Sequence, residues 1–205
     1  QRRGSIVNAL EKKPMLLFNT AAGTQKIQKL MIKPLNPAVI IERKSKSMAK
    51  RNIVLRGDEI LRKSSREVTE FNEKLWVLLD DMAETMYAQD GVGLAAVQVG
   101  ILRRVVVVDT GEQLYELVNP EIIEESGSQT GGEGCLSFPD EYGQVTRPMK
   151  VTVRAQDRNG REFTVEGEEL LARAFCHEID HLNGRLFVDL VEDEEPMPRT
   201  RRKHR

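Results

Sequence analysis

Hydrophobic residues settle into a regular pattern between Thr69 and Gly91. Six of them recur at spacings of three and four residues: Phe71, Leu75, Leu78, Leu79, Met82 and Met86. This spacing places the six side chains on one face of an amphipathic helix, and core packing is the simplest function for such a face. We therefore expect a helix that begins near Thr69 and ends before Gly91.

Further along, the pattern favours extended chain. The segment from Arg103 to Asp109 is a β-branched run, which is typical of a central strand. The segment from Leu114 to Glu125 has the character of a second extended region, interrupted at Asn119-Pro120. Both segments are therefore expected to be strands.

A hairpin and a last helix complete the pattern. Lys150 to Arg154 alternates apolar and polar residues and is expected to be the first strand of the hairpin, and Phe163 to Val165 the second. Between them, Asn159-Gly160 suits a two-residue turn with positive φ. The helix should begin near Glu168-Glu169, because carboxylates suit a helix N-terminus, and should stop at Gly184.

Length and composition indicate one domain. A chain of 205 residues with 40% hydrophobic and 31% charged residues is long enough for a sizeable core. Apolar runs such as Val105 to Val108 are far too short to cross a bilayer, and the N-terminus lacks the order of a secretory signal. We therefore expect a soluble protein without a membrane partner.

Charge divides the chain near Met48. Residues 1–47 carry ten Lys or Arg against two Glu, a net charge of +8, while the whole chain carries −1 and the remainder therefore −9. Pro14, Pro34 and Pro37 break any long helix in this leader, which we expect to be disordered. It could be upstream sequence, an expression remnant or an organellar targeting segment, and the globular unit is expected to start at Met48.

The candidate chemistry centres on the motif H-E-x-x-H at positions 177 to 181. On a helix, residues four apart lie one turn above each other, so His177 and His181 can grip one metal ion while Glu178 leans over the same face. A solvated helix that happens to carry two histidines is the alternative. A third ligand elsewhere would decide between them.

Two cysteines are the only thiols, too few for a disulfide framework, and they fit a reducing compartment. Cys176 lies about 100° around the helix from the neighbouring histidine and shares a face with Asp180, so it joins both histidines on one ion only with difficulty. Cys135, in a stretch expected to be extended, is the predicted third ligand. His204 lies in the charged tail and is unconvincing. Three ligands leave one coordination position open, as a catalytic site requires.

The stretch from Gly91 to Gln98 is also unusual. Its two glycines satisfy neither nucleotide-binding motif and instead suggest backbone brought close to another group. Gln98 is the one polar side chain in an apolar run. It could be an ordinary buried hydrogen-bonding residue or an oriented donor for a reacting oxygen.

Three stretches together resemble, in order and spacing, the signature motifs of peptide deformylases: Gly91 to Gln98, Glu133 to Ser137 and His177 to His181. The resemblance covers roughly Met48 to Leu190. It implies an α+β fold with a mixed or antiparallel sheet packed around a central metal-binding HExxH helix. It also implies removal of the formyl group from the N-terminal formylmethionine of new proteins, which releases formate. The compartment would be the bacterial cytoplasm, or an organelle if the leader is a transit peptide.

The resemblance also implies roles for single residues. The metal ligands would be Cys135, His177 and His181. The natural ion would be Fe²⁺, with Zn²⁺, Ni²⁺ or Co²⁺ as substitutes, whereas a Cys/His/His site alone would indicate zinc. Glu178 would transfer protons, and the Gln98 amide and the Leu136 backbone N–H would stabilise the developing oxyanion.

Substrate would be an N-formylmethionyl nascent polypeptide. Gly93 matches a position near the substrate backbone, and three residues are candidates for walls of the methionine pocket: Val92, Leu170 and Ala174. Tyr142 stands where some family members have a substrate-contacting arginine, which leaves preferences beyond methionine open. Asp180 on a partly buried helix needs a partner, for which Arg147 is the prediction.

Other functions remain open on sequence grounds. A zinc protease would take its third ligand downstream of the helix. A metal-stabilised binding module could contact nucleic acid with the leader and with Arg199 to Arg205. For a deformylase, the charged tail of residues 191–205 is expected to help the enzyme reach the ribosome through contact with phosphate.

Overall fold

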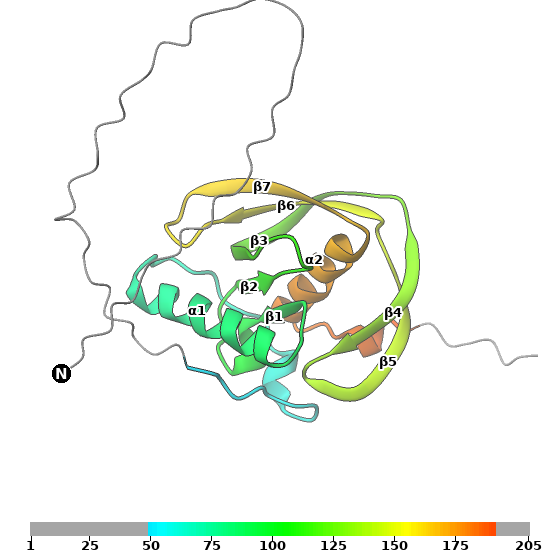
Figure 1. Cartoon of the computed structure of the whole chain (residues 1–205), viewed down its shortest axis with the longest axis horizontal. Coiled ribbons are helices and arrows are strands. Elements are labelled where there is room, and N and C mark those ends of the chain that lie inside the picture. The colour runs from blue at the N-terminus through cyan, green and yellow to red at the C-terminus, as the bar shows by residue number, and fades with distance from the viewer. Residues whose placement is uncertain (1–48, 192–205) are drawn as a thin grey trace, which may run out of the picture. The chain divides into compact units, whose positions relative to one another are not determined.

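A computed structural model describes residues 49–191 (Figure 1). The expected leader of residues 1–47 and nearly all of the expected tail of residues 191–205 lie outside this range. Two helices are present in it, α1 (Glu73–Ala88) and α2 (Glu169–Leu182). Short 3-10 turns are η2 (Glu59–Arg62), η3 (Ala96–Val99) and η4 (Phe187–Asp189). In these residues no helix combines the length and apolar character needed to span a bilayer.

Seven strands form two sheets. Their bounds are β1 (Gly93–Ala95), β2 (Val105–Val108), β3 (Tyr115–Ser126), β4 (Gln129–Cys135), β5 (Phe138–Arg147), β6 (Lys150–Gln156) and β7 (Glu162–Glu168). The larger sheet has the order β1-β2-β3-β6-β7, and β4 pairs with β5 in a two-stranded sheet, here called the ribbon. Every pairing between these strands is antiparallel. The predicted α+β class is confirmed, and of the two sheet types expected the antiparallel one is found.

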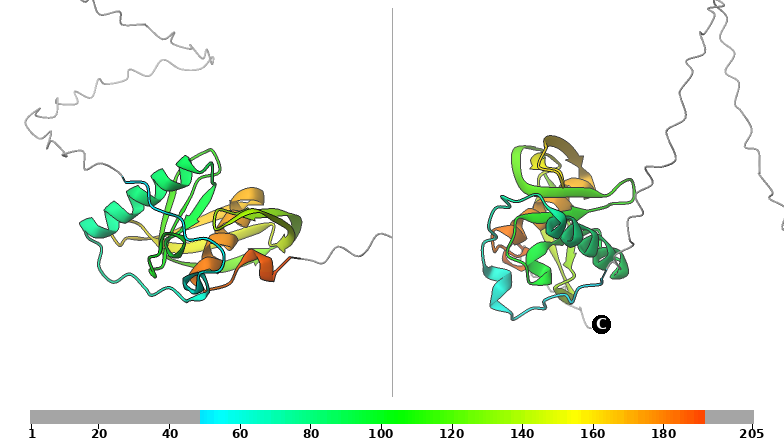
Figure 2. Two further views of the ribbon diagram at one scale, coloured as in Figure 1. Left: turned by 90° about the horizontal axis from the view of Figure 1, so that it is seen from below. Right: turned by 90° about the vertical axis from the view of Figure 1, so that its left-hand side faces the viewer.

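The larger sheet is covered on both faces near β2. All four valines of β2 are fully buried. Val105 and Val107 belong to the core that α1 covers, whereas Val106 and Val108 belong to the core that α2 covers. Because successive side chains of a strand point to opposite faces, the four valines are buried on both sides of the sheet, and the predicted central strand is confirmed. Figure 2 shows the two helices and this sheet from two further sides.

The predicted helix near Thr69 forms, over a shorter range. It starts at Glu73 because the Asn72 side chain accepts hydrogen bonds from the backbone N–H groups of Lys74 and Leu75 and so caps the helix. Leu75, Leu79 and the other predicted core positions within the helix are buried. The predicted amphipathic face is therefore confirmed.

The strand β3 continues through Asn119-Pro120 with a shift of register between Val118 and Glu121. Asn119 adopts a positive φ of 52°, and its side chain accepts from the backbone N–H of Val68 at 2.8 Å and donates to the Val68 carbonyl at 2.9 Å. The predicted interruption is thus a bulge that anchors the segment before α1.

The predicted hairpin is formed by β6 and β7, but the predicted two-residue turn is wrong. Five residues connect the strands, and of the expected pair only Gly160 has a positive φ, 82°. The Asp157 carboxylate accepts hydrogen bonds from the backbone N–H groups of Asn159 and Arg161, at 2.8 and 2.9 Å. This side chain holds a wider loop than a type I′ turn would.

The helix α2 lies against β1, β2 and β7 of the larger sheet and also touches β5 of the ribbon (Figure 1). It ends as predicted. Gly184, with φ at 73°, donates to the His181 carbonyl at 3.1 Å, and Arg185 donates to the Asp180 carbonyl at 3.0 Å. This is a Schellman motif, which satisfies the last carbonyls of the helix.

We expect Gly184→Ala to destabilise the fold more than Gly57→Ala. Both glycines have positive φ, for which a residue with a Cβ loses about 1 to 3 kcal/mol. A Cβ at Gly184 would also lie 2.3 Å from the Arg62 carbonyl oxygen, whereas a Cβ at Gly57 meets nothing within 4 Å. Urea unfolding of the two variants measures the difference. Equal losses of unfolding free energy would mean that the close approach to Arg62 is unimportant.

Candidate functional site

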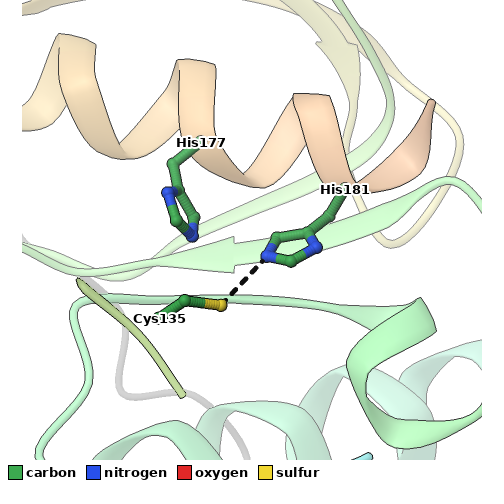
Figure 3. A group of neighbouring side chains, drawn as sticks. All are labelled: Cys135, His177 and His181. Carbon is green, nitrogen blue, oxygen red and sulfur yellow. Dashed lines mark hydrogen bonds between the residues drawn. The ribbon is translucent and has the colours of Figure 1, made fainter. Parts of the chain in front are cut away.

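Three potential metal ligands meet between α2 and the end of β4. One ligand atom each from Cys135, His177 and His181 lies within 4.8 Å of the other two. His177 is 8% exposed and His181 is 1% exposed. The helical spacing of four residues turns both rings toward the thiol, whose Sγ lies 3.3 Å from His181 Nε2 (Figure 3). Sequence reasoning predicted these three residues, and the fold brings them together.

The surroundings of this group fit a metal ion. His181 is almost fully buried, and burial lowers the pKa of its ring. Its Nδ1 atom has no hydrogen-bond partner in the part of the chain that the structure describes. A thiolate and two imidazoles suit several divalent first-row ions and leave a coordination position free.

Glu178 lies beside the candidate ligands, and its carboxyl group leaves no room for a side chain on Gly93. The carboxyl group is buried, and a Cβ on Gly93 would lie 2.4 Å from Glu178 Oε1. The predicted close approach of backbone to another group is therefore confirmed at this glycine. Burial raises the pKa of Glu178 to about 7. Among residues 49–191 no group hydrogen-bonds to its Oε2 atom.

Gln98 has a fixed orientation. Its Oε1 accepts from the Ala95 backbone N–H at 2.8 Å, so its Nε2 points to Cys135 Sγ at 3.4 Å and Ser137 Oγ at 3.3 Å. The side chain is 1% exposed. Gln98 is therefore a buried hydrogen-bonding residue whose NH₂ group has a fixed orientation beside the ligand group, and both predicted alternatives are compatible with this geometry.

A cavity of about 560 Å³ opens beside these groups. Its lining includes the four residues predicted to bind substrate, namely Val92, Gly93, Leu170 and Ala174. Val92 is 44% exposed and Leu170 is 51% exposed. Leu136 also lines the cavity, and its side chain lies so close to Gly91 that a Cβ there would be 2.8 Å from Cδ1. The cavity is thus lined by two of the predicted ligands, Cys135 and His177, together with Glu178 and the apolar walls.

A family model described as polypeptide deformylase matches residues 50–197. The chain belongs to the polypeptide deformylase family. Its members are metal-dependent hydrolases that remove the N-formyl group from newly made polypeptides.

Individual deformylases match over most of their length. The peptide deformylase of Thermoanaerobacter pseudethanolicus is 60% identical over 152 residues, which is 72% of this chain and 96% of that protein. The crystal structure of the Thermotoga maritima enzyme matches with a TM-score of 0.69 and 42% identity, over 70% of this chain and 99% of that one. A Synechococcus elongatus deformylase in complex with actinonin matches with a TM-score of 0.68 and 39% identity, over 72% and 84% of the two chains.

The other thiol of this deformylase chain stays apart from the ligands. Cys176 is 5% exposed and packs in the core between α2 and the larger sheet. Burial raises the pKa of its thiol to about 11, so it remains protonated at neutral pH. The candidate third ligand, Cys135, lies upstream of the helix, whereas a zinc protease would take its third ligand from downstream. His204 lies outside the described residues.

A buried ionic network supports the deformylase ligands, and sequence reasoning missed its centre, Glu133. One carboxylate oxygen of Glu133 accepts from Arg147 Nε and Arg173 Nη1, both at 2.9 Å. The other lies 3.0 Å from His177 Nδ1, which leaves Nε2 of that ring for an ion. Arg147 also pairs with Asp180 at 2.5 Å, so the predicted partner of Asp180 is confirmed.

Two spacings could have indicated this network. Glu133 precedes Cys135 by two residues in an extended stretch, which places both on one face. Arg173 precedes His177 by four residues, one turn along the same helix. Burial alone would raise the pKa of Glu133, but hydrogen bonds from His177 and Arg147 outweigh it and lower the pKa to about 2.

We expect Glu133→Gln to lose about 3 to 5 kcal/mol of stability at neutral pH, because two buried guanidinium groups then lack one negative charge. The pKa of Glu133 in the folded protein, about 2, lies below its ordinary value of 4.5. Its stabilising contribution is therefore present above pH 4.5 and is lost as the pH falls toward 2. Urea unfolding of the variant and the parent across this range measures the gap, which should narrow in acid. A gap that is independent of pH would contradict the assignment.

Proposed function

We propose that this chain hydrolyses the N-formyl group of N-terminal formylmethionine, with Cys135, His177 and His181 as ligands of the catalytic ion. The observation that carries the proposal is the convergence of the three ligand atoms within 4.8 Å, beside a cavity that Cys135, His177 and the buried Glu178 line. The helix α2 would then be the central metal-binding helix of the fold. The family membership of the chain supports the reaction, and the geometry of the site supports the choice of residues.

The natural ion in this proposal is iron(II), with zinc, nickel or cobalt as substitutes. One thiolate and two imidazoles accept all four, so the donor set alone does not select among them. When bound, the ion would supply a Lewis acid that brings the pKa of water at the site close to neutrality.

Glu178 moves the protons of the reaction. Its carboxylate accepts a proton from the attacking water, whose oxygen forms a bond to the formyl carbon. The same carboxyl group then gives the proton to the amine nitrogen as the carbon–nitrogen bond breaks, so formate and a free amino terminus result. Burial raises the pKa of Glu178, which suits a carboxyl group that both accepts and gives a proton near neutral pH.

Two donors stabilise the formyl oxygen as it gains charge, the Gln98 side-chain amide and the Leu136 backbone N–H. The Ala95 backbone N–H holds the carbonyl end of Gln98, so its NH₂ group is already turned toward the ligand group, and donation to the formyl oxygen would replace one of its bonds to Cys135 or Ser137. Removing a single donor of this type typically costs on the order of 10²- to 10³-fold in rate.

Methionine occupies the apolar part of the cavity. Val92, Leu170 and Ala174 form its walls, and the backbone of Gly93 runs along the substrate. Val92 and Leu170 are about half exposed, so a bound side chain would cover them. Apolar walls discriminate weakly between similar side chains, so selection of the formyl group falls to the polar residues.

We expect Glu178→Gln to lower kcat by about 10²- to 10⁴-fold, because the amide cannot accept the proton. The ion content should stay near one per chain, and actinonin should still bind, since the ligands are unchanged. Formate released anaerobically from a formyl-Met peptide measures the rate, and Glu162→Gln on an exposed strand position serves as the control. A metal-free variant would make Glu178 a ligand or structural residue. Full activity with the ion bound would assign the base to another group.

Oxygen should distinguish iron from nickel in this site. In air the iron(II) enzyme should lose activity as the ion and the Cys135 thiolate oxidise, whereas the nickel enzyme should last longer. Activity followed over time for both forms, with oxidation of Cys135 read by mass spectrometry, tests this. Cys176→Ala should change neither lifetime. Equal lifetimes of the two forms would argue against iron-centred inactivation.

The proposed catalytic unit spans residues 48–190, with the leader outside it. Bacterial relatives favour the bacterial cytoplasm as its compartment, unless the leader directs the chain to an organelle.

The charged tail is proposed to contact the ribosome. We expect co-sedimentation with ribosomes that weakens steeply with salt, because the tail would contact phosphate. A chain that ends at Pro198 should bind less. Equal binding by that chain would remove the tail from the contact.

A further inference from the structure

The ligand group depends on how two separate elements lie against each other. Cys135 ends β4 in the ribbon, whereas His177 and His181 belong to α2. A two-stranded sheet has little stability of its own, so the ribbon needs contacts that hold it in place. The position of the thiol relative to the two rings is therefore set by whatever ties the ribbon to α2.

Arg173 makes such a tie to the main chain of both ribbon strands. It lies on α2 one turn before His177, and the residue is 8% exposed. Its guanidinium donates to the backbone carbonyls of Gln129 at 3.2 Å and Gly131 at 3.3 Å in β4, and of Val145 at 2.8 Å in β5. One helical side chain thus holds three carbonyls of the ribbon.

The fit between ribbon and guanidinium is close. A Cβ on Gly131 would lie 3.2 Å from Arg173 Nη2, so the absence of a side chain there lets β4 approach the arginine. The fourth acceptor is Glu133, at 2.9 Å, which itself holds His177. Arg173 therefore acts on both sides of the ligand group, on the strand that ends in Cys135 and on the carboxylate that orients His177.

Charge compensation alone does not explain this arrangement. Arg147 already gives Glu133 two hydrogen bonds, at 2.9 and 3.1 Å, and its remaining bond goes to Asp180. Three of the four acceptors of Arg173 are neutral carbonyls, and they are reached from two nitrogens, Nη1 toward Gly131 and Val145 and Nη2 toward Gln129, whereas a lysine offers a single nitrogen. The arginine thus contributes geometry in addition to charge.

We propose that Arg173 is a positioning residue that sets the distance between the Cys135 thiol and the two histidines by clamping the ribbon to α2. This inference rests on the metal site of the proposed function. Loss of the clamp leaves all three ligands in the chain but lets the thiol move away from the two rings.

Cobalt(II) is a direct probe, because its absorption reports the thiolate bond without any turnover. Three full-length variants are compared with the parent chain: Arg173→Met, Arg173→Lys and Arg158→Met. Arg158 is the matched control, since it also ties a helix to the larger sheet through Asp80 and Glu116 but lies away from the ligands. Competition with a chromophoric chelator gives the affinity, circular dichroism the fold, and formate release kcat and KM.

Arg173→Met is expected to bind cobalt about 10- to 100-fold more weakly, which is the range for substitution of residues that orient metal ligands without binding the ion. Its thiolate-to-cobalt band should weaken or shift, and kcat should fall with KM little changed. Arg173→Lys keeps the charge but not the fork, so it should lie between this variant and the parent. Arg158→Met should unfold at lower temperature with the parental cobalt affinity and band.

Parental affinity and band in Arg173→Met would overturn the proposal. If that variant does not fold, the same result in Arg173→Lys would overturn it, because the single nitrogen of lysine cannot replace the separate contacts of Nη1 and Nη2. If Arg158→Met lost as much cobalt affinity as Arg173→Met, the effect of Arg173 would be one of general stability, and the proposal would be wrong. Failure of the proposed function would appear separately, as a parent chain that binds cobalt through the thiolate yet releases no formate.

Discussion

A single buried carboxylate, that of Glu133, links the two parts of the molecule that carry the proposed metal ligands. Two arginines and a histidine donate to it, one of them from the ribbon and two from α2. A buried charge is expensive unless it is paired and hydrogen-bonded, and here every interaction that compensates it also holds a ligand-bearing element. The hydrogen bonds that compensate the buried charge of Glu133 therefore also fix the positions of the ribbon and α2 relative to each other.

The helix α2 meets this requirement while it also completes the core. Its apolar side chains, including Phe175 and Ile179, pack on the larger sheet, and its polar side chains turn toward the ribbon and the cavity. The Schellman motif at Gly184 ends the helix one turn after the second histidine, where the chain passes close to Arg62. The same short segment therefore has to pack on the sheet, end at Gly184 and place two histidines one turn apart, so few substitutions in it would meet all three conditions.

Local periodicity explains what could be predicted from sequence. The helical spacing of His177 and His181, the apolar face of α1 and the alternation of the hairpin strands each depend on neighbours along the chain. Cys135 was reached from spacing and chain geometry, and the resemblance to deformylases supported it. The bond from Arg173 to Val145 joins residues 28 positions apart, and no local pattern encodes it. The length of the loop between β6 and β7 was not predicted for another reason: the Asp157 side chain accepts hydrogen bonds from backbone N–H groups of the loop and so favours a wider loop.

X-ray absorption spectroscopy of the zinc-loaded protein tests the central claim most directly, since it identifies the atoms around the ion. We predict one sulfur near 2.3 Å and two imidazole nitrogens at about 2.0 to 2.1 Å, with an oxygen atom in the remaining position. The sulfur signal should disappear in Cys135→Ala and persist in Cys176→Ala. A spectrum without sulfur, or a sulfur signal that disappears only in Cys176→Ala, would contradict the assignment of the site.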